Sequence, residues 1–277
     1  MQIISSLSEL RTARLSLTGR VGLVPTMGYL HEGHLSLVRR AKEECDHAIV
    51  TIFVNPTQFG ANEDLSKYPR DMERDLNLLH PLGVDVVWTP TAEIIYPPGY
   101  QTWVEVDALT KGLEGAMRPG HFRGVATVVA KLFNATQPHK AYFGQKDAQQ
   151  AAVIRRMAVD LNFPLEVIIS PTTREADGLA MSSRNKYLNE AERKAATVLF
   201  RALSAAKELY EAGERDGETL RRKMKDVLSN ESLVQVQYVS CADYDSLEEL
   251  DVVTGKTLLS MAVYLGKTRL IDNFVLG

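Results

Sequence analysis

The architecture follows from one segment, Val21-Gly22-Leu23-Val24-Pro25-Thr26-Met27-Gly28-Tyr29-Leu30-His31-Glu32-Gly33-His34. The segment opens with an apolar run, glycines punctuate its centre, and an amphipathic stretch follows it. This order predicts a short buried strand that passes through a turn into a helix. In a parallel α/β sheet, ligands bind at the carboxyl ends of the strands, so the turn is a candidate ligand site.

The turn carries residue types suited to a nucleotide phosphate. Gly28 and Gly33 allow a phosphate to approach the backbone closely, and a helix beginning near His34 is expected to offer unpaired N–H groups. His31 and His34 add imidazole donors. Two alternatives stay open. The histidines could form a metal pair, although their order differs from the H-E-x-x-H of zinc proteases and no further ligands stand nearby, or they could cap the helix.

A regular alternation of patterns extends this unit into a sheet. Strand-length apolar runs stand at 2–4, 48–54, 84–88, 141–143 and 165–169, and helical patterns at 7–17, 34–45, 70–82, 122–134 and 148–161. Such alternation predicts a parallel sheet with right-handed crossovers, in a Rossmann-like fold. Residues 103–106 alternate in polarity and predict an edge strand.

The pattern changes after residues 171–173. A capping-box start at Asn189-x-x-Glu192 predicts one long helix ending before Gly213, followed by a second helix at 218–228. Three strand patterns, at 234–240, 258–264 and 270–275, are then grouped together. We expect an α/β chain with two domains: a Rossmann-like nucleotide-binding domain at 1–173, and a smaller α+β domain at 174–277.

Composition narrows the class of protein. The 277 residues are 45% hydrophobic and carry a formal net charge of −3, which supports a sizeable core and argues against a nucleic-acid partner. We find neither a signal-peptide pattern nor an apolar run of membrane-spanning length. Cys45 and Cys241 stand far apart without a C-x-x-C motif, as expected of buried thiols in a reducing compartment. These features predict a cytoplasmic protein without a membrane partner.

Three further loops hold polar residues at or just after expected strand ends. Gln58, in Asn55-Pro56-Thr57-Gln58-Phe59, could bind a hydroxyl and a carboxylate or be an ordinary turn amide. Lys146, in Gly144-Gln145-Lys146-Asp147-Ala148-Gln149-Gln150, could clamp a phosphate or be solvated, and Asp147 could cap a helix or bind a ribose hydroxyl. In Met181-Ser182-Ser183-Arg184, the serines and Arg184 could bind phosphates, or Arg184 could be exposed beside a helix cap.

These loops resemble, in the same order, those of the pantoate–β-alanine ligase family. Pro25-Thr26-Met27-Gly28 with His31-x-Gly33-His34 is similar to the family's form of the HIGH motif of adenylate-forming nucleotidyltransferases. The second loop resembles its N-P-x-Q-F segment, the fourth its counterpart of the KMSKS loop, and residues 113–125 another family segment. The resemblance implies ATP-dependent condensation of pantoate with β-alanine through pantoyl adenylate, releasing AMP and pyrophosphate.

The resemblance also implies residue roles. His34, Lys146 and Arg184, together with Mg²⁺, would stabilise the charge that develops on the phosphates, and no protein residue is assigned as a metal ligand. The residues expected to bind ATP are Met27, Gly28, Tyr29, Leu30, His31, Glu32, Gly33, His34, Gly144, Gln145, Lys146, Asp147, Thr173, Met181, Ser182, Ser183 and Arg184. Gln58 and Gln150 would bind pantoate and β-alanine. Glu114 and Arg118 would shape the pocket, the polar loop 61–69 and the C-terminal domain would close over the intermediate, and the family resemblance implies a homodimer.

Two other functions would share part of this pattern. A nucleotidyltransferase that acts on another acceptor, such as phosphopantetheine, would share the HIGH-type turn but lack the paired glutamines. A non-catalytic nucleotide-binding regulator would not need polar groups from three further loops aimed at a second substrate.

Overall fold

The computed structural model describes residues 1–60 and 65–277. Positions 61–64, which form part of the polar loop expected to close over the intermediate, lie outside the described residues. The chain divides into two compact units. The first comprises Met1–Gly144 and Gln150–Pro171, and the second comprises Gln145–Gln149 and Thr172–Gly277.

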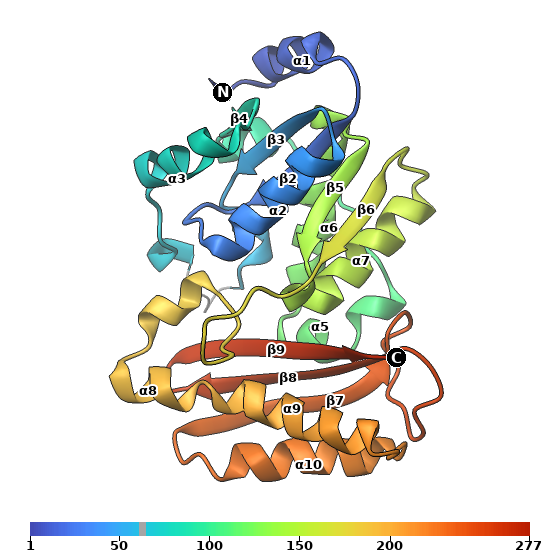
Figure 1. The fold of residues 1–277 in the computed structure, drawn as a ribbon. Helices are drawn as coiled ribbons and strands as arrows, with labels where there is room; N and C mark the ends of the chain where they lie inside the picture. The colour runs from blue at the N-terminus through green and yellow to red at the C-terminus, as the bar shows by residue number, and fades with distance from the viewer. Residues whose placement is uncertain (61–64) are drawn as a thin grey trace. The chain divides into compact units, whose positions relative to one another are not determined.

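The first unit is built on a six-stranded parallel sheet (Figure 1). Its strands are β1 (Gln2–Ile4), β2 (Val21–Thr26), β3 (His47–Ile52), β4 (Val86–Trp88), β5 (Lys140–Gly144) and β6 (Glu166–Ser170), in the order β1-β4-β3-β2-β5-β6. The intervening helices are α1 (Leu7–Ser16), α2 (Glu32–Glu44), α3 (Met72–Leu79), α4 (Ala92–Ile95), α5 (Leu113–Met117), α6 (His121–Thr136) and α7 (Ala148–Asp160). The predicted Rossmann-like sheet is therefore confirmed.

Helices cover both faces of this sheet. Along β2, Val21 and Leu23 join a core that includes side chains of α1, α6 and α7, whereas Val24 joins the core formed with α2 and α3. Successive strand residues point to opposite faces, so a strand buried on both sides must be apolar throughout. This explains why the strand segments read as continuous apolar runs.

The strand order reverses between β2 and β5. From β2 the chain builds outward through β3 to β4 on one side, and β5 and β6 lie on the other. In doubly wound sheets, the crevice at such a switch point receives the ligand. β2 ends at Thr26 and β5 at Gly144, where the first and third polar loops begin.

The second unit is a three-stranded antiparallel sheet with helices, which confirms the predicted α+β character. Its elements are α8 (Glu190–Ala195), α9 (Val198–Glu211), α10 (Gly217–Ser229), β7 (Val234–Asp243), β8 (Thr257–Leu265) and β9 (Thr268–Leu276). Leu203 of α9 and Met224 of α10 pack with Met261 of β8 in the core.

Short 3₁₀ turns occur in both units, at Pro56–Gln58, Leu65–Lys67, His80–Leu82, Ala108–Thr110, Gln145–Asp147 and Ser183–Tyr187.

The predicted edge strand at 103–106 is wrong. The Val104 N–H donates to the Thr127 hydroxyl of α6 at 3.0 Å instead of to a neighbouring strand. The Trp103 ring lies 4.4 Å from the Arg123 guanidinium and is stacked on Tyr96, with ring centroids 6.1 Å apart. Contacts with α6 and with Tyr96, which follows α4, thus take the place of the strand pairing that the alternation in polarity predicts.

The long helix predicted from Asn189 is two helices. Its capping box is confirmed, because Asn189 accepts from the Glu192 N–H and Glu192 accepts from the Asn189 N–H. The helix then breaks between α8 and α9, where the Thr197 hydroxyl donates to the Lys194 carbonyl at 2.9 Å. A hydroxyl that binds a nearby carbonyl competes with the helical backbone, and periodicity alone does not reveal this.

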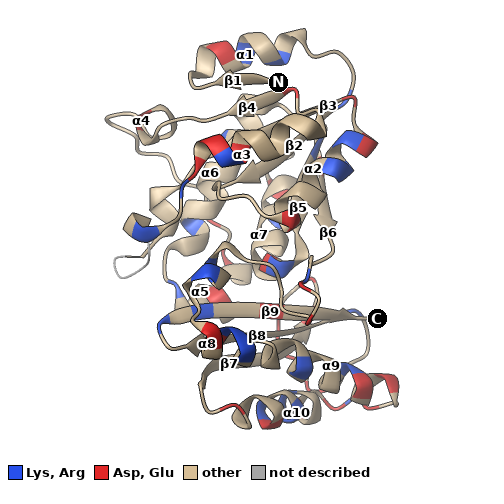
Figure 2. Ribbon diagram, turned by 60° about the vertical axis from the view of Figure 1, so that its left-hand side comes forward, with Lys and Arg blue, Asp and Glu red and all other residues tan. Residues whose placement is uncertain are grey.

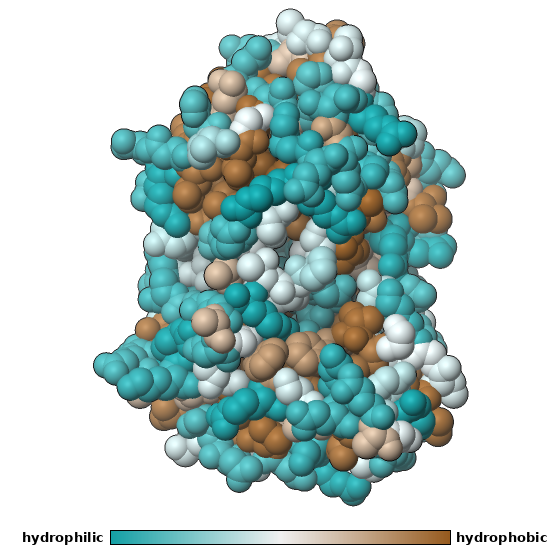
Figure 3. Space-filling model, in the orientation of Figure 1, coloured by the Kyte–Doolittle hydropathy of each residue, from teal (hydrophilic) through white to brown (hydrophobic). Residues whose placement is uncertain are grey.

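The charged residues of both signs are spread over the helices, for example along α2 and α10 (Figure 2). On the face shown in Figure 3, hydrophobic side chains are interspersed with hydrophilic ones. Among the residues that the structure describes, no helix has the length and apolarity to cross a membrane.

Candidate active site

Two histidines cap α2 reciprocally. His31 is the N-cap residue, and its Nδ1 accepts the Gly33 N–H at 3.2 Å. The Nδ1 of His34 accepts the His31 N–H at 3.3 Å, and the two ring centroids are 4.1 Å apart. The helix consequently begins at Glu32, two residues earlier than predicted. The capping alternative is thus part of the structure.

This cap favours one tautomer of each neutral ring. A ring nitrogen that accepts a hydrogen bond carries no hydrogen, so a neutral imidazole bound through Nδ1 has its hydrogen on Nε2. Each histidine is therefore a donor at Nε2 while its Nδ1 serves the backbone.

The backbone donors of the turn serve the turn itself. The Gly28 N–H donates to the Thr26 hydroxyl at 3.2 Å, and the Tyr29 and Leu30 N–H groups both donate to Asp75 of α3 at 2.7 Å. The His34 N–H donates to the His31 carbonyl at 2.8 Å. The expectation of unpaired N–H groups at this helix start is wrong for Gly33 and His34, whose N–H groups both donate to His31.

A buried asparagine organises the second loop. Asn55, 1% exposed, donates through Nδ2 to Gln58 Oε1 at 3.1 Å and to the Gly124 carbonyl at 3.2 Å. Its Oδ1 accepts from the Tyr96 hydroxyl at 2.8 Å. Gln58 Nε2 lies 3.2 Å from the sulfur of Met27, so the first and second loops meet through these two side chains.

His121 supports the backbone of Gln58. Arg118 Nη1 lies 3.0 Å from His121 Nε2, and His121 Nδ1 lies 2.8 Å from the Gln58 carbonyl oxygen. Because a guanidinium only donates, Nε2 accepts and Nδ1 carries the hydrogen that Gln58 receives. A Cβ on Gly124 would stand 2.4 Å from the Thr57 carbonyl oxygen, so only glycine lets α6 approach this loop so closely.

In the second unit, Asn273 of β9 holds the lysine loop. Its Nδ2 donates to the carbonyls of Gln145 and Lys146 at 3.0 and 2.9 Å, and its Oδ1 accepts from Gln145 Nε2 at 3.1 Å. Asn273 is 4% exposed. The residues of the lysine loop that make these contacts belong to the second unit, although β5, which precedes them, belongs to the first.

Asp272, which precedes Asn273 in β9, anchors the segment that leads into the fourth loop, where Arg174 and Ala180 form an antiparallel bridge. Buried Asp272 receives a bidentate ion pair from Arg174, at 2.7 and 2.9 Å. The backbone of Met181 donates to the Thr173 carbonyl at 2.9 Å, which brings together two residues expected to bind ATP. Ser182 caps the following 3₁₀ turn by accepting the Arg184 N–H at 3.2 Å.

Gln150 lies half-buried in the first turn of α7, Lys146 is half-buried and Asp147 is exposed. Sequence reasoning assigned no role to Asn55, which stands in the second loop, and missed Asp75 and the pair Asp272-Asn273. One signal was available for the pair, because two polar residues interrupt the otherwise apolar run Leu270-Ile271-Asp272-Asn273-Phe274-Val275 of an expected buried strand.

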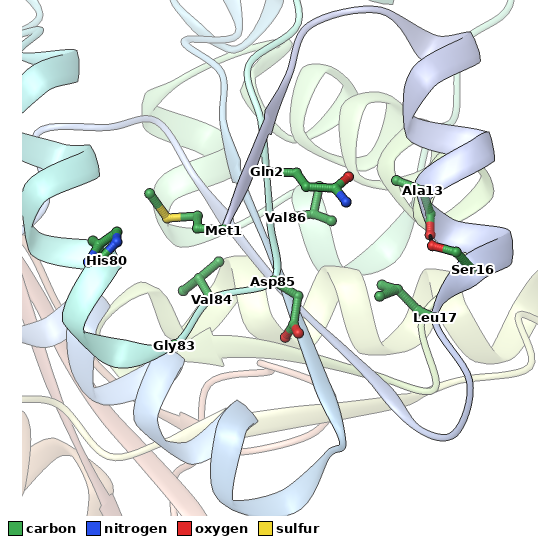
Figure 4. A pocket seen from close by; sticks show the side chains of 10 residues that line it. All are labelled: Met1, Gln2, Ala13, Ser16, Leu17, His80, Gly83, Val84, Asp85 and Val86. Atoms are coloured by element: carbon green, nitrogen blue, oxygen red, sulfur yellow. Dashed lines mark hydrogen bonds between the residues drawn. The ribbon is translucent and has the colours of Figure 1, made fainter.

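One cavity of about 330 Å³ lies elsewhere in the first unit (Figure 4). Met1, Gln2, Asp85 and Val86 line it beside residues of α1, so it sits at the amino ends of β1 and β4. The first three polar loops follow the opposite, carboxyl ends of β2, β3 and β5. Among the described residues, no cluster of three or more His, Cys, Asp and Glu side chains could hold a metal ion.

The doubly wound sheet, with polar turns at its switch point, defines a ligand-binding α/β protein. The family model for pantoate–β-alanine ligase matches residues 2–275. The chain is 63% identical to pantothenate synthetase of Roseiflexus castenholzii, over 100% of this chain and 99% of the relative. It is 59% identical to that of Herpetosiphon aurantiacus, with both chains covered fully.

Solved structures of the same family have a similar fold over nearly the whole chain. The pantothenate synthetase of Thermus thermophilus superposes with a TM-score of 0.95 at 46% identity, covering 99% of each chain. A pantoate–β-alanine ligase from Francisella tularensis, complexed with β-γ ATP and β-alanine, gives a TM-score of 0.81 at 36% identity, covering 99% of this chain and 97% of that one. The chain belongs to the pantoate–β-alanine ligase family. It is an enzyme that condenses pantoate with β-alanine in an ATP-dependent reaction.

Proposed function

We propose that His31 and His34, the two histidines that cap α2, donate hydrogen bonds to the phosphates of ATP during formation of pantoyl adenylate. The pantoate carboxylate attacks the α-phosphate, and pyrophosphate leaves. The β-alanine amine then attacks the acyl carbon, loses a proton, and AMP leaves. The observation that carries the proposal is the reciprocal cap, which leaves Nε2 of His31 and His34 as the donor atom of each ring.

Lys146 and Arg184 supply the positive charge in this proposal. Phosphoryl-transfer steps depend mainly on positioning and on stabilising the charge that develops on the phosphates. Asn273 binds the carbonyl of Lys146, and Ser182 binds the N–H of Arg184, so both cations stand on anchored backbone within one unit. Thr173 would meet the adenine, and the other residues of the four polar loops that are expected to bind ATP would complete the site.

Gln58 and Gln150 are assigned to pantoate. The Gln58 side chain is oriented by Asn55, and its backbone is bound by His121, which is the support expected of a group that must present an amide in one direction. Pantoate offers two hydroxyls and a carboxylate, which match the donor and acceptor atoms of the two amides.

Mg²⁺ enters in this proposal as MgATP. The described residues form no cluster of three His, Cys, Asp or Glu side chains to hold the ion. Mg²⁺ usually keeps several waters and binds through substrate phosphates, so a protein cage is not required for the substrate complex.

The test is exchange of labelled pyrophosphate into ATP. Because the amine enters only after pyrophosphate leaves, exchange should require pantoate and MgATP and proceed without β-alanine. Exchange without pantoate, or exchange that depends on β-alanine, would contradict the stepwise route. A fragment of residues 1–173 should not support exchange, since it lacks Arg184 and the β9 residue that anchors Lys146.

We further propose a cytoplasmic homodimer without a nucleic-acid partner. Two cysteines, both buried and unpaired in disulfides, support a reducing compartment. The dimer rests on the family resemblance, and Val159 and Leu161, 64% and 51% exposed, are apolar side chains that an interface could cover. Sedimentation at micromolar concentration tests the dimer, and a purely monomeric boundary would exclude it.

A further inference from the structure

A buried carboxylate lies beneath the first turn and has no part in the proposed chemistry. Asp75 of α3 is 1% exposed and accepts the Tyr29 N–H through Oδ2 and the Leu30 N–H through Oδ1, both at 2.7 Å. Each oxygen therefore receives a short hydrogen bond from the backbone of the turn. Hydrogen bonds to an ionised acceptor are shorter and stronger than neutral ones, and these two have that length.

The backbone that Asp75 binds is one that needs support. Gly28 and Tyr29 both have positive φ angles, 81° and 51°. Tyrosine disfavours this left-handed region because its Cβ crowds the backbone, whereas glycine adopts it readily. Successive N–H groups in such turns converge to form a concavity that binds anions, and here a side chain of the same unit fills it.

The turn also fits tightly against its surroundings. A Cβ added to Gly28 would stand 3.0 Å from Ile52 Cγ2 and 3.1 Å from Asp75 Oδ2. The Arg74 guanidinium lies 5.0 Å from the centre of the Tyr29 ring, and its Nη1 is 3.5 Å from Asp75 Oδ1. The residue after Leu30 is His31, whose cap starts α2, so the conformation of the turn determines where both imidazoles stand.

We propose that Asp75 is a positioning residue of the ligase reaction, holding the turn Gly28–Leu30 in the conformation that presents His31 and His34 at the end of β2. It acts through the turn and not on the substrate, because both carboxylate oxygens are bound to backbone N–H groups. Burial raises the pKa of Asp75, and the hydrogen bonds from Leu30 and Tyr29 oppose this rise.

The first experiment compares Asp75→Asn with Glu73→Gln. Both remove one carboxylate from α3, but Glu73 is exposed and lies outside the turn. An asparagine turns an NH₂ group toward one of the two N–H donors, so pyrophosphate exchange should slow by about 10- to 100-fold, as expected when a charge-assisted hydrogen bond is lost. Glu73→Gln should exchange at the normal rate, and pantoate affinity without ATP should change less than about two-fold in both. Normal exchange by folded Asp75→Asn protein would overturn the proposal.

A double-mutant cycle separates positioning from general destabilisation. Tyr29→Gly relieves the left-handed strain at this position, so the turn depends less on the carboxylate. The loss caused by Asp75→Asn should therefore be several-fold smaller in the Tyr29→Gly background than in the unmodified chain. Equal losses in the two backgrounds would show that Asp75 stabilises the protein without setting the turn.

The unmodified enzyme gives an independent readout if Asp75→Asn fails to fold. In a ¹⁵N-labelled sample, the amides of Tyr29 and Leu30 should resonate downfield and exchange slowly with solvent, as buried donors to a carboxylate. Exchange of both amides at the rate of an unstructured peptide would refute the contact, and with it the proposal.

Discussion

Replacing Asn273 with aspartate tests whether the lysine loop must be anchored for ATP to be used. The change preserves side-chain shape but converts the Nδ2 donor into a carboxylate oxygen facing the carbonyls of Gln145 and Lys146, now 3.0 and 2.9 Å away. Two hydrogen bonds worth about 0.5–1.5 kcal/mol each are lost, and two carbonyls then face a negative charge. The two lost hydrogen bonds together remove roughly 1–3 kcal/mol of anchoring, and the repulsion between the carboxylate and the two carbonyls adds to this loss.

We expect kcat/KM for ATP in the pantoate-dependent exchange to fall about 10- to 1,000-fold, since each 1.4 kcal/mol corresponds to roughly ten-fold. Gln235→Glu is the matched control, because it also makes an amide acidic in the second unit but on an exposed position of β7. Thermal unfolding should establish that the Asn273→Asp protein is folded at the assay temperature. A folded variant with an unchanged kcat/KM for ATP would show that the anchor is dispensable.

Three shorter predictions complete the set. His34→Ala should slow adenylation by about 10²–10³-fold, the effect of losing one preorganised donor, and normal turnover by the folded variant would remove His34 from the mechanism. Gln150→Ala should weaken pantoate binding, measured by calorimetry, by ~1–3 kcal/mol for each hydrogen bond left unmade, and should change ATP affinity little. An unaltered pantoate affinity would exclude Gln150 from pantoate binding. Glu44 accepts from Lys140, Arg40 and Tyr142, which together lower its pKa to about 2. A carboxyl pKa that is lower in the folded state stabilises that state at pH values above the pKa of the unfolded chain. Glu44→Gln should therefore reduce the free energy of unfolding by ~1–2 kcal/mol at pH 7 after allowance for solvent screening, and the difference should vanish as pH falls from about 4.5 toward 2. A difference that does not depend on pH in urea titrations would contradict the ion-pair explanation.

The sheet could be predicted because its signal is local. Continuous apolar strands and intervening amphipathic helices reflect burial on both faces, which the β2 residues Leu23 and Val24 illustrate by facing opposite cores. The edge strand at 103–106 failed because polarity alternates in the same way whether a segment pairs with a strand or packs on a helix. Backbone pairing depends on a neighbour that local periodicity does not identify.

The supporting residues of the candidate site could not be predicted for a related reason. Asp75 follows the turn it holds by 45 residues along the chain, and Asn273 lies 127 residues from Lys146. Neither belongs to a motif, and a lone acidic residue in an amphipathic helix is usually solvated. The polar interruption of the β9 pattern was the one local sign that a buried side chain had a hydrogen-bonding task.

The first turn shows why side chains must carry the charge in the proposed adenylation. In a phosphate-binding loop of the glycine-rich kind, backbone N–H groups point at the ligand. Here the N–H groups of Tyr29, Leu30 and Gly33 stabilise the turn and its cap, so in the proposed site the imidazole Nε2 atoms would take over the donor role. Protonating Nδ1 of His31 or His34 would set two donors against each other and break the cap that places the ring. In the proposed site the rings would act as neutral donors, and we expect Lys146, Arg184 and the ion that accompanies ATP to supply the positive charge for the departing pyrophosphate.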